Sequence, residues 1–212
     1  VAGYDTNVEG YESSTDYVYG ELAKAPDVIT GVKRNGNRTL TYGYDVLNRM
    51  QSRIIQTTTP FVTEYEYLPG AEDGTTTSLV KTVQKGNDTY DYSYDALGNI
   101  LEIKKNDVLV ERYEYDALNQ LTKVEGPEVT YEYTYDNGGN LLSVKEIGEE
   151  TNVIKTYTYG DSEWKDLLTS YNNQTITYDA IGNPLTYING RTFTWIDGRK
   201  LATIAQGDDN IS

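Results

Sequence analysis

Polar and apolar residues alternate along most of this sequence, and tyrosine is the usual apolar member of the pattern. Residues 90–95 read YDYSYD and residues 131–136 read YEYTYD, so every second side chain is a tyrosine. A repeat of two residues is the period of a β-strand, whose successive side chains point to opposite faces of the sheet. These segments therefore predict strands with one tyrosine face and one polar face.

A turn and a second strand follow each of these segments. The stretches 95–99 (DALGN) and 179–183 (DAIGN) open with an Asp that can bond nearby backbone amides and contain a Gly or Asn that accepts a left-handed conformation. The second strand opens with two apolar residues three positions apart. A spacing of three puts them on opposite faces unless a β-bulge intervenes. The pairs are Ile100/Ile103, Leu121/Val124, Leu141/Val144, Leu185/Ile188 and Leu201/Ile204.

The second strand ends in another turn, whose sequence varies. It reads RNGN at 34–37, KGND at 85–88, KND at 105–107 and ING at 188–190. Asn-Gly between two strands is a strong hairpin signal. No segment has the pattern of a useful helix, so the sequence predicts antiparallel hairpins laid side by side.

This unit repeats through the chain. The last aromatic residue before each Asp-type turn recurs roughly every 22 residues, which is typical of a repeat architecture. We therefore expect residues 1–212 to form one continuous array of about eight repeats. The predicted fold class is all-β, a curved or spiralling antiparallel sheet of consecutive β-hairpins. The anchor residues are Tyr19, Tyr44, Tyr67, Tyr94, Tyr115, Tyr135, Tyr159, Tyr178 and Trp195.

Charge and composition exclude several classes of function. The chain has 18 Lys and Arg against 33 Asp and Glu, a net charge of −15, so we expect neither nucleic acid nor a membrane as a partner. Cysteine is absent, which excludes disulfides and thiolate metal sites. Tyrosine occurs 21 times against 2 Phe and 2 Trp, a composition that suits a half-buried strand surface.

The same composition argues against catalysis. With no His and no Cys, an enzyme would depend on carboxylates, Lys, Tyr or Ser, and no Ser lies in a G-x-S-x-G motif. The sequence does not exclude a catalytic pair of carboxylates, as in glycosidases, among its 33 acidic residues. The stretches 136–140 (DNGGN) and 206–210 (QGDDN) offer oxygen ligands for calcium but match no known loop spacing. We predict no catalytic residues, no cofactor and no metal site.

The repeated unit resembles a known family. YSYDALGNILEI (92–103), YEYDALNQLTKV (113–124) and YTYDNGGNLLSV (133–144) are similar to the YD, or Rhs, repeat, and the resemblance covers nearly all of residues 15–204. In that family, which includes bacterial wall-associated toxins, the C components of insecticidal toxin complexes and teneurins, the hairpins spiral into a hollow β-shell. In bacterial members the shell encloses a toxin made as the C-terminal part of the same chain. The core motif that closes such shells is absent, as is any toxin-like segment.

The resemblance assigns a structural role to the repeated residues. They are Tyr44, Asp45, Tyr94, Asp95, Gly98, Asn99, Tyr115, Asp116, Tyr135, Asp136, Gly139, Asn140, Tyr178, Asp179, Gly182 and Asn183. It implies a non-catalytic wall segment of a secreted or cell wall-associated bacterial protein, of Gram-positive type. The partners implied are the rest of the parent shell and its toxin. The alternative is a glycan-binding module, because Tyr beside Asp and Asn suits sugars.

Two further expectations concern packing. We expect the tyrosines of one face, among them Tyr92, Tyr113 and Tyr133, to form a cross-strand ladder. We also expect open sheet edges at both ends, because the last hairpin, which begins at Lys200, lacks its returning strand in the predicted pattern. Open edges favour self-association.

Overall fold

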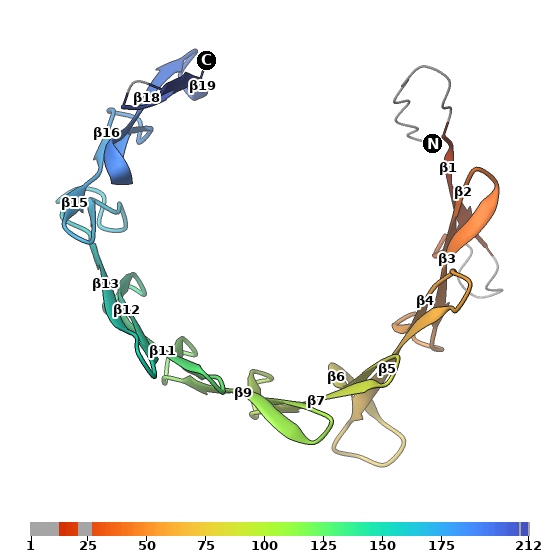
Figure 1. Cartoon of the computed structure of the whole chain (residues 1–212). Helices are drawn as coiled ribbons and strands as arrows, with labels where there is room; N and C mark the ends of the chain where they lie inside the picture. Colours follow the sequence, from red (N-terminus) through yellow and green to blue (C-terminus); the bar gives the residue numbers. More distant parts are fainter. Residues whose placement is uncertain (1–12, 21–26, 208, 212) are drawn as a thin grey trace. The chain divides into compact units, whose positions relative to one another are not determined.

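The computed structural model describes residues 13–20, 27–207 and 209–211. Within these residues every regular element is a β-strand, apart from one turn of 3-10 helix at Ile188–Gly190. Each strand pairs antiparallel with the next along the chain, in the order β1 to β15 and again β16 to β20 (Figure 1). The predicted all-β class and the array of consecutive antiparallel hairpins are confirmed.

The backbone packs as two units, residues 1–111 and 112–212. The prediction of a single array over 1–212 stays a prediction. The first unit contains β1 (Thr15–Tyr19), β2 (Ile29–Arg34), β3 (Asn37–Tyr44), β4 (Met50–Ile55), β5 (Phe61–Pro69), β6 (Thr76–Lys85), β7 (Asp88–Tyr94) and β8 (Ile100–Lys105).

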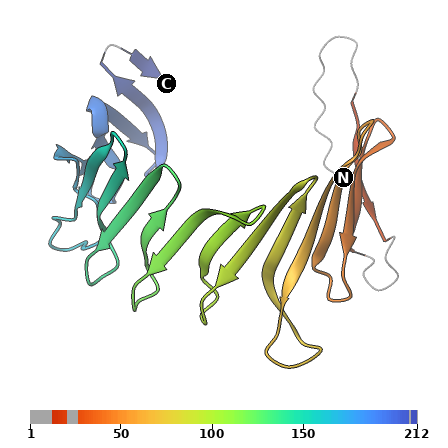
Figure 2. The same ribbon diagram turned by 60° about the horizontal axis from the view of Figure 1, so that its bottom comes forward.

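Strand β9 (Val108–Tyr115) begins in the first unit and ends in the second. The second unit continues with β10 (Leu121–Glu125), β11 (Val129–Tyr135), β12 (Leu141–Gly148), β13 (Asn152–Thr158), β14 (Ser170–Tyr171), β15 (Gln174–Thr175), β16 (Thr177–Tyr178), β17 (Pro184–Tyr187), β18 (Arg191–Ile196), β19 (Lys200–Gln206) and β20 (Asp209–Ile211). Within each unit the turns lie at the two ends of the strands (Figure 2).

A β-bulge follows most of the Asp-type turns. In β7–β8, Tyr92 lies opposite Ile103 and Tyr94 opposite Ile100, so Leu101 is the extra residue. The bulge therefore brings both members of the apolar pair onto the tyrosine face, although their spacing of three would otherwise separate them. The extra residue in the other hairpins is Thr30, Gln51, Lys81, Thr122, Leu142, Leu185 and Ala202.

One predicted apolar pair is wrong by one position. Pro184, not Leu185, lies opposite Tyr178, and Leu185 is the extra residue of this bulge. Ile188 accordingly lies in the 3-10 turn rather than in the strand. The alternation of the sequence fits both alignments, because proline is a poor marker of an apolar strand position.

The expected ladder of tyrosine on tyrosine is also wrong. Tyr113 lies opposite Val124, which lies opposite Tyr131 on its other side, and Tyr133 lies opposite Val144. The tyrosine face is therefore a mixed surface, in which tyrosines such as Tyr92, Tyr113 and Tyr133 lie opposite aliphatic residues of the neighbouring strand. A ring pair does occur in β13–β14, where Tyr157 and Tyr171 have ring centres 5.1 Å apart.

A single sheet buries little. Among the described residues the buried apolar side chains are Val83 and Ile176, and most tyrosines are half-buried. The polar face carries cross-strand ion pairs, such as Lys145 with Glu132 at 3.4 Å. Both side chains are partly exposed, so each such pair contributes at most about 1 kcal/mol. Stability must come largely from the hydrogen bonds between strands and hairpins.

The last hairpin has a returning strand, contrary to our expectation. The three residues of β20 pair with β19, and Ile211 lies opposite Ile204. The expected edge at the other end rests on residues 1–12, which lie outside the described residues, and self-association stays a prediction.

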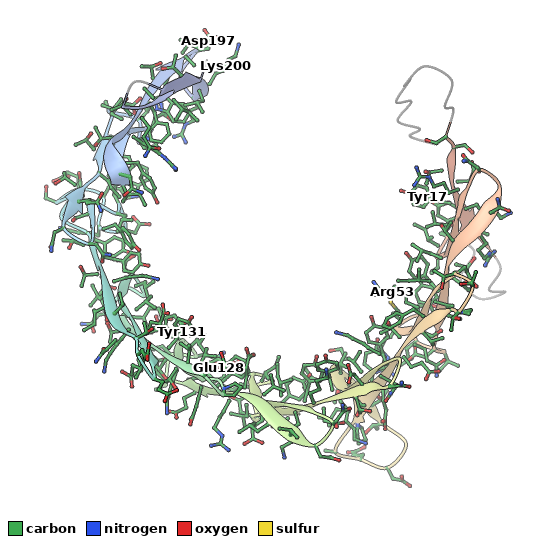
Figure 3. The ribbon with its side chains drawn as sticks, viewed as in Figure 1. Tyr17, Arg53, Glu128, Tyr131, Asp197 and Lys200 are labelled. Carbon is green, nitrogen blue, oxygen red and sulfur yellow. The ribbon has the colours of Figure 1, made fainter. Side chains whose placement is uncertain are left out.

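Arg53 is an exception to the apolar pattern of the tyrosine face. It lies between Tyr42 and Thr63, at the position that Ile103 and Val124 occupy in other hairpins. Figure 3 shows it on the same side of the first unit's sheet as Tyr17. Its Nε atom and the Thr63 hydroxyl are buried and have no hydrogen-bond partner among the described residues. An unsatisfied buried donor is costly.

We therefore expect the Arg53→Ile variant to be more stable than the unmodified chain, by about 1–2 kcal/mol in urea unfolding. The change removes the unsatisfied donor and restores the aliphatic residue of the repeat. Lys104→Ile, on the polar face, is the control and should change the free energy of unfolding by less than about 0.5 kcal/mol. A destabilised Arg53→Ile variant would contradict this account.

Candidate functional site: the links between consecutive hairpins

Each Asp-type turn is closed by its own aspartate. The Asp95 Oδ1 atom accepts hydrogen bonds from the backbone N–H groups of Leu97 and Asn99, both at 2.9 Å. Its Oδ2 atom accepts one from the Asn99 side-chain amide at 2.8 Å. Gly98 lies between them at a φ of 89°, a left-handed conformation that suits glycine. One carboxylate thus fixes a reversal of four residues.

The same arrangement recurs at the other Asp-type turns. In each of these turns the Asp Oδ2 atom accepts a hydrogen bond from the side chain of the residue four positions later. This position therefore carries a side chain with an N–H donor, which is Asn, Gln or Arg. Where glycine is missing, Asn48 and Asn119 take its place with φ values of 60° and 67°. The pairs of first and fifth residues are Asp45/Arg49, Asp116/Gln120, Asp136/Asn140 and Asp179/Asn183.

The turn carboxyls are therefore stronger acids than usual. Hydrogen bonds from Asn99 hold the pKa of Asp95 below its ordinary value, and Asn140 does the same for Asp136. At Asp179, burial raises the pKa, but the bonds from Asn183, Ile181 and Gly182 outweigh it and the net pKa is lowered. The charged carboxylate is the form that holds the turn.

Six of the anchor aromatics make a second contact, which we call the aromatic link. The Tyr135 hydroxyl donates to the backbone oxygen of Leu121, on the adjacent strand of the preceding repeat, at 2.8 Å. Leu121 lies opposite Tyr115 and directly before the bulge of its own hairpin. A bulge disrupts the ladder at this point, and a buried carbonyl needs a partner. The next anchor supplies it.

The aromatic link recurs along the array. Burial raises the pKa of Tyr94, Tyr135 and Tyr178, so these hydroxyls stay protonated and can donate. Trp195 replaces tyrosine in the last link and uses its indole N–H, which is also a donor. The other links are Tyr44 to Ile29 (2.8 Å), Tyr67 to Met50 (2.8 Å), Tyr94 to Val80 (2.5 Å), Tyr178 to Leu168 (2.7 Å) and Trp195 to Pro184 (2.7 Å).

A third contact, the asparagine link, lies at the other ends of the strands, away from the Asp-type turns. Asn106 is the first residue after β8, with a φ of 51°. Its backbone N–H donates to the carbonyl of Thr89 at 2.8 Å, and its Oδ1 accepts from the N–H of Thr89 at 2.8 Å. The side chain thus extends the strand ladder by one pair. Asn35 with Ser14 and Asn172 with Thr156 do the same.

Sequence reasoning missed the asparagine link and assigned these residues to turns alone. The signal was present, because RNGN, KND and YNN each place Asn directly after a strand. The sixteen motif residues, in contrast, all lie at the five turns that begin with Asp45, Asp95, Asp116, Asp136 and Asp179, where each tyrosine ends its strand.

Within the described part of the chain, no cluster of three or more acidic residues could hold a metal ion. No helix there is long and apolar enough to cross a membrane.

Comparison with known proteins finds similar structures but no similar sequence family. No family model and no curated protein matches the chain. Its backbone is similar to a Tc holotoxin pore structure from Photorhabdus luminescens, with a TM-score of 0.71 and 17% identity over 91% of this chain and 11% of that chain. It is also similar to TcdB2–TccC3 without its hypervariable C-terminal region, with a TM-score of 0.56 and 17% identity over 94% of this chain and 14% of that chain.

A third similar structure, TcdB2–TccC3–TEV, has a TM-score of 0.57 and 17% identity over 84% of this chain and 12% of that chain. The chain thus spans only a small part of the length of these proteins. The resemblance to YD-repeat shell proteins is confirmed at the level of the fold.

Removal of a single hydroxyl tests the aromatic link. We expect Tyr135→Phe to lower the free energy of unfolding by about 1 kcal/mol, because it leaves the Leu121 carbonyl without its donor and keeps the ring. Tyr133→Phe is the matched control, since Tyr133 lies on the same strand and face and its hydroxyl makes no hydrogen bond among the described residues. Equal effects of the two changes in urea unfolding would refute the link.

The turn carboxyls predict how stability depends on pH. Their folded-state pKa values lie below the unfolded value of about 3.9, so their contribution is complete above that pH and is lost as the pH falls through the folded value. For this reason we expect the urea concentration at the midpoint of unfolding to decrease once the pH falls below about 4. Asp95→Asn should lower the midpoint at pH 7 and flatten the acid dependence, whereas Asp73→Asn, in an exposed loop, should change neither.

Proposed function

We propose that this chain is a non-catalytic wall segment of a β-shell that encloses another part of the same protein. The observation that carries the proposal is the aromatic link, in which the side chain of an anchor donates to a backbone carbonyl of the preceding repeat at six places along the array. A contact of this kind can be repeated without limit, so it builds a continuous wall rather than a single pocket. The similar Tc toxin structures support this role, and most of their length lies beyond the part that this chain matches.

The finer parts of the proposal follow from the resemblance. We assign to the parent protein a C-terminal toxin as cargo, with the rest of the shell as the second partner. We place it outside a bacterial cell, and association with a Gram-positive cell wall is a further proposal, compatible with the absence of cysteine. The anchors and turn residues would act by holding the wall together, and none would touch a substrate.

Glycan binding is the second candidate. The exposed rings of Tyr17 and Tyr19 favour it, at 52% and 53% exposure, because they are open to a stacking sugar. The anchors in the aromatic links argue against it for the rest of the array, since their hydroxyls already donate to backbone carbonyls. Loss of glycan binding in Tyr17→Ala, with unchanged stability, would support this second function.

The wall role predicts protection of the enclosed segment. In the parent protein that contains this array, we expect the region after the array to resist limited proteolysis while the shell is intact. Tyr94→Phe combined with Tyr135→Phe should open the wall and speed cleavage of that region at least several-fold, whereas Tyr133→Phe should not. Equally rapid cleavage in the unmodified protein would refute the wall role.

A further inference from the structure

The longest departure from the repeat in the second unit lies between β13 and β14. Here residues 160–169 form an extended loop that carries Trp164, one of the two tryptophans in the chain. The loop and the next Asp-type turn line an open cavity of about 470 Å³. Its walls include Asp161, Glu163, Trp164, Leu167, Tyr178 and Asp179.

The loop is held in a defined shape. The Asp161 Oδ1 atom accepts hydrogen bonds from the backbone N–H groups of Glu163 (2.9 Å) and Trp164 (2.8 Å). The N–H of Leu167 donates to the carbonyl of Trp164 at 3.1 Å. These bonds fix the backbone on both sides of Trp164, so the tryptophan is presented by an ordered turn.

The Trp164 ring rests against the following turn. A Cβ atom on Gly182 would come within 2.5 Å of its Cζ3 atom, so the ring packs directly on the glycine backbone. The residue is nevertheless 46% exposed, so much of the large apolar ring stays open. Packing on Gly182 explains where the ring lies. It does not explain why an exposed indole stands beside acidic groups.

The cavity is acidic. Asp161, Glu163 and Asp179 all line it, and hydrogen bonds from Trp164 and Glu163 lower the pKa of Asp161. Both oxygens of Asp179 are engaged within its own turn, so Asp161 and Glu163 are the carboxylates that can serve a ligand. Lys165 stabilises the charged form of Asp161, and the Arg199 guanidinium donates to the Ile181 carbonyl of the Asp179 turn at 3.1 Å. Three carboxylates against these two cations leave the site negative.

We propose that this cavity binds the guanidinium group of an arginine side chain from a partner polypeptide. An open tryptophan ring attracts a cation to its face, and the planar, weakly hydrated guanidinium stacks on it better than an ammonium does. Carboxylates beside the ring accept its N–H groups, with bidentate geometry available. The volume lies within the range of ligand pockets and admits a whole arginine side chain. The site goes beyond the wall role, because it needs only these two neighbouring turns.

Intrinsic fluorescence can test the site on the full 212-residue chain. Trp195→Tyr leaves Trp164 as the sole tryptophan and keeps a donor for the Pro184 carbonyl, as tyrosine does in the other links. Calorimetry on the unmodified chain and on this variant checks that the change does not alter binding. The probe is an arginine-containing peptide, and the same peptide with citrulline is its uncharged control. We expect a saturable change in Trp164 emission with the arginine peptide, weaker at high salt, and at least tenfold weaker binding of the citrulline peptide.

Variants locate the binding. Glu163→Gln should weaken the arginine peptide severalfold, and Glu149→Gln, an exposed acid outside the cavity, should leave the affinity unchanged. Trp164→Leu should abolish binding, and thermal unfolding will show whether the loop still folds. If Trp164→Leu does not fold, Glu163→Gln decides the question alone. Equal binding of the citrulline peptide, equal effects of the two glutamate changes, absence of saturable binding, or preferential binding of a neutral sugar would each overturn the proposal.

Discussion

The hydrogen bond from an anchor aromatic to a backbone carbonyl of the preceding repeat is the contact on which the rest of the array depends. It is made by Tyr44, Tyr67, Tyr94, Tyr135, Tyr178 and Trp195. The bulge brings two apolar side chains to the tyrosine face, but it disturbs the ladder at a half-buried point. The next hairpin supplies the missing donor, as Tyr135 does for Leu121. One hairpin is therefore complete only when its neighbour is in place. This makes stability a property of neighbouring pairs, as expected for a repeat protein.

The same contact explains why the anchors are tyrosines. A phenylalanine would fill the same space on the tyrosine face, but it would leave the carbonyl without a partner. The need for a donor therefore applies to the anchors, whereas a tyrosine between anchors, such as Tyr133, makes no such bond within the described residues. Trp195 supports this reading, because its indole N–H makes the same bond to Pro184. With few apolar side chains fully buried, such bonds matter more here than in a protein with a thick core.

The sequence was sufficient to predict the strands, the Asp-type turns and the order of the hairpins, because each has a local signature. Alternation defines a strand, and Asp followed by Gly-Asn defines the turn at Asp95. The bulge has only an ambiguous signature, since an apolar spacing of three fits either a bulge or a pair of residues on opposite faces. For this reason the sequence predicts Leu185 at the position opposite Tyr178 that Pro184 occupies. It also predicts a ladder of tyrosines without the aliphatic residues, such as Val124, that lie between them. The asparagine link was missed because an Asn in a turn already has a local explanation.

The departures from the repeat show where individual function can lie in such an array. Positions that make links cannot vary without opening the wall, so Asp179 and Tyr178 serve their turn and their link before anything else. Loops between strands have more freedom, because added length there costs little in loop entropy. The loop of Trp164 still supplies the Leu168 carbonyl that accepts the Tyr178 hydroxyl at 2.7 Å, and it also sets an aromatic ring beside Asp161 and Glu163. A repeated frame with variable loops lets one stretch of the array acquire a binding site without loss of its architecture.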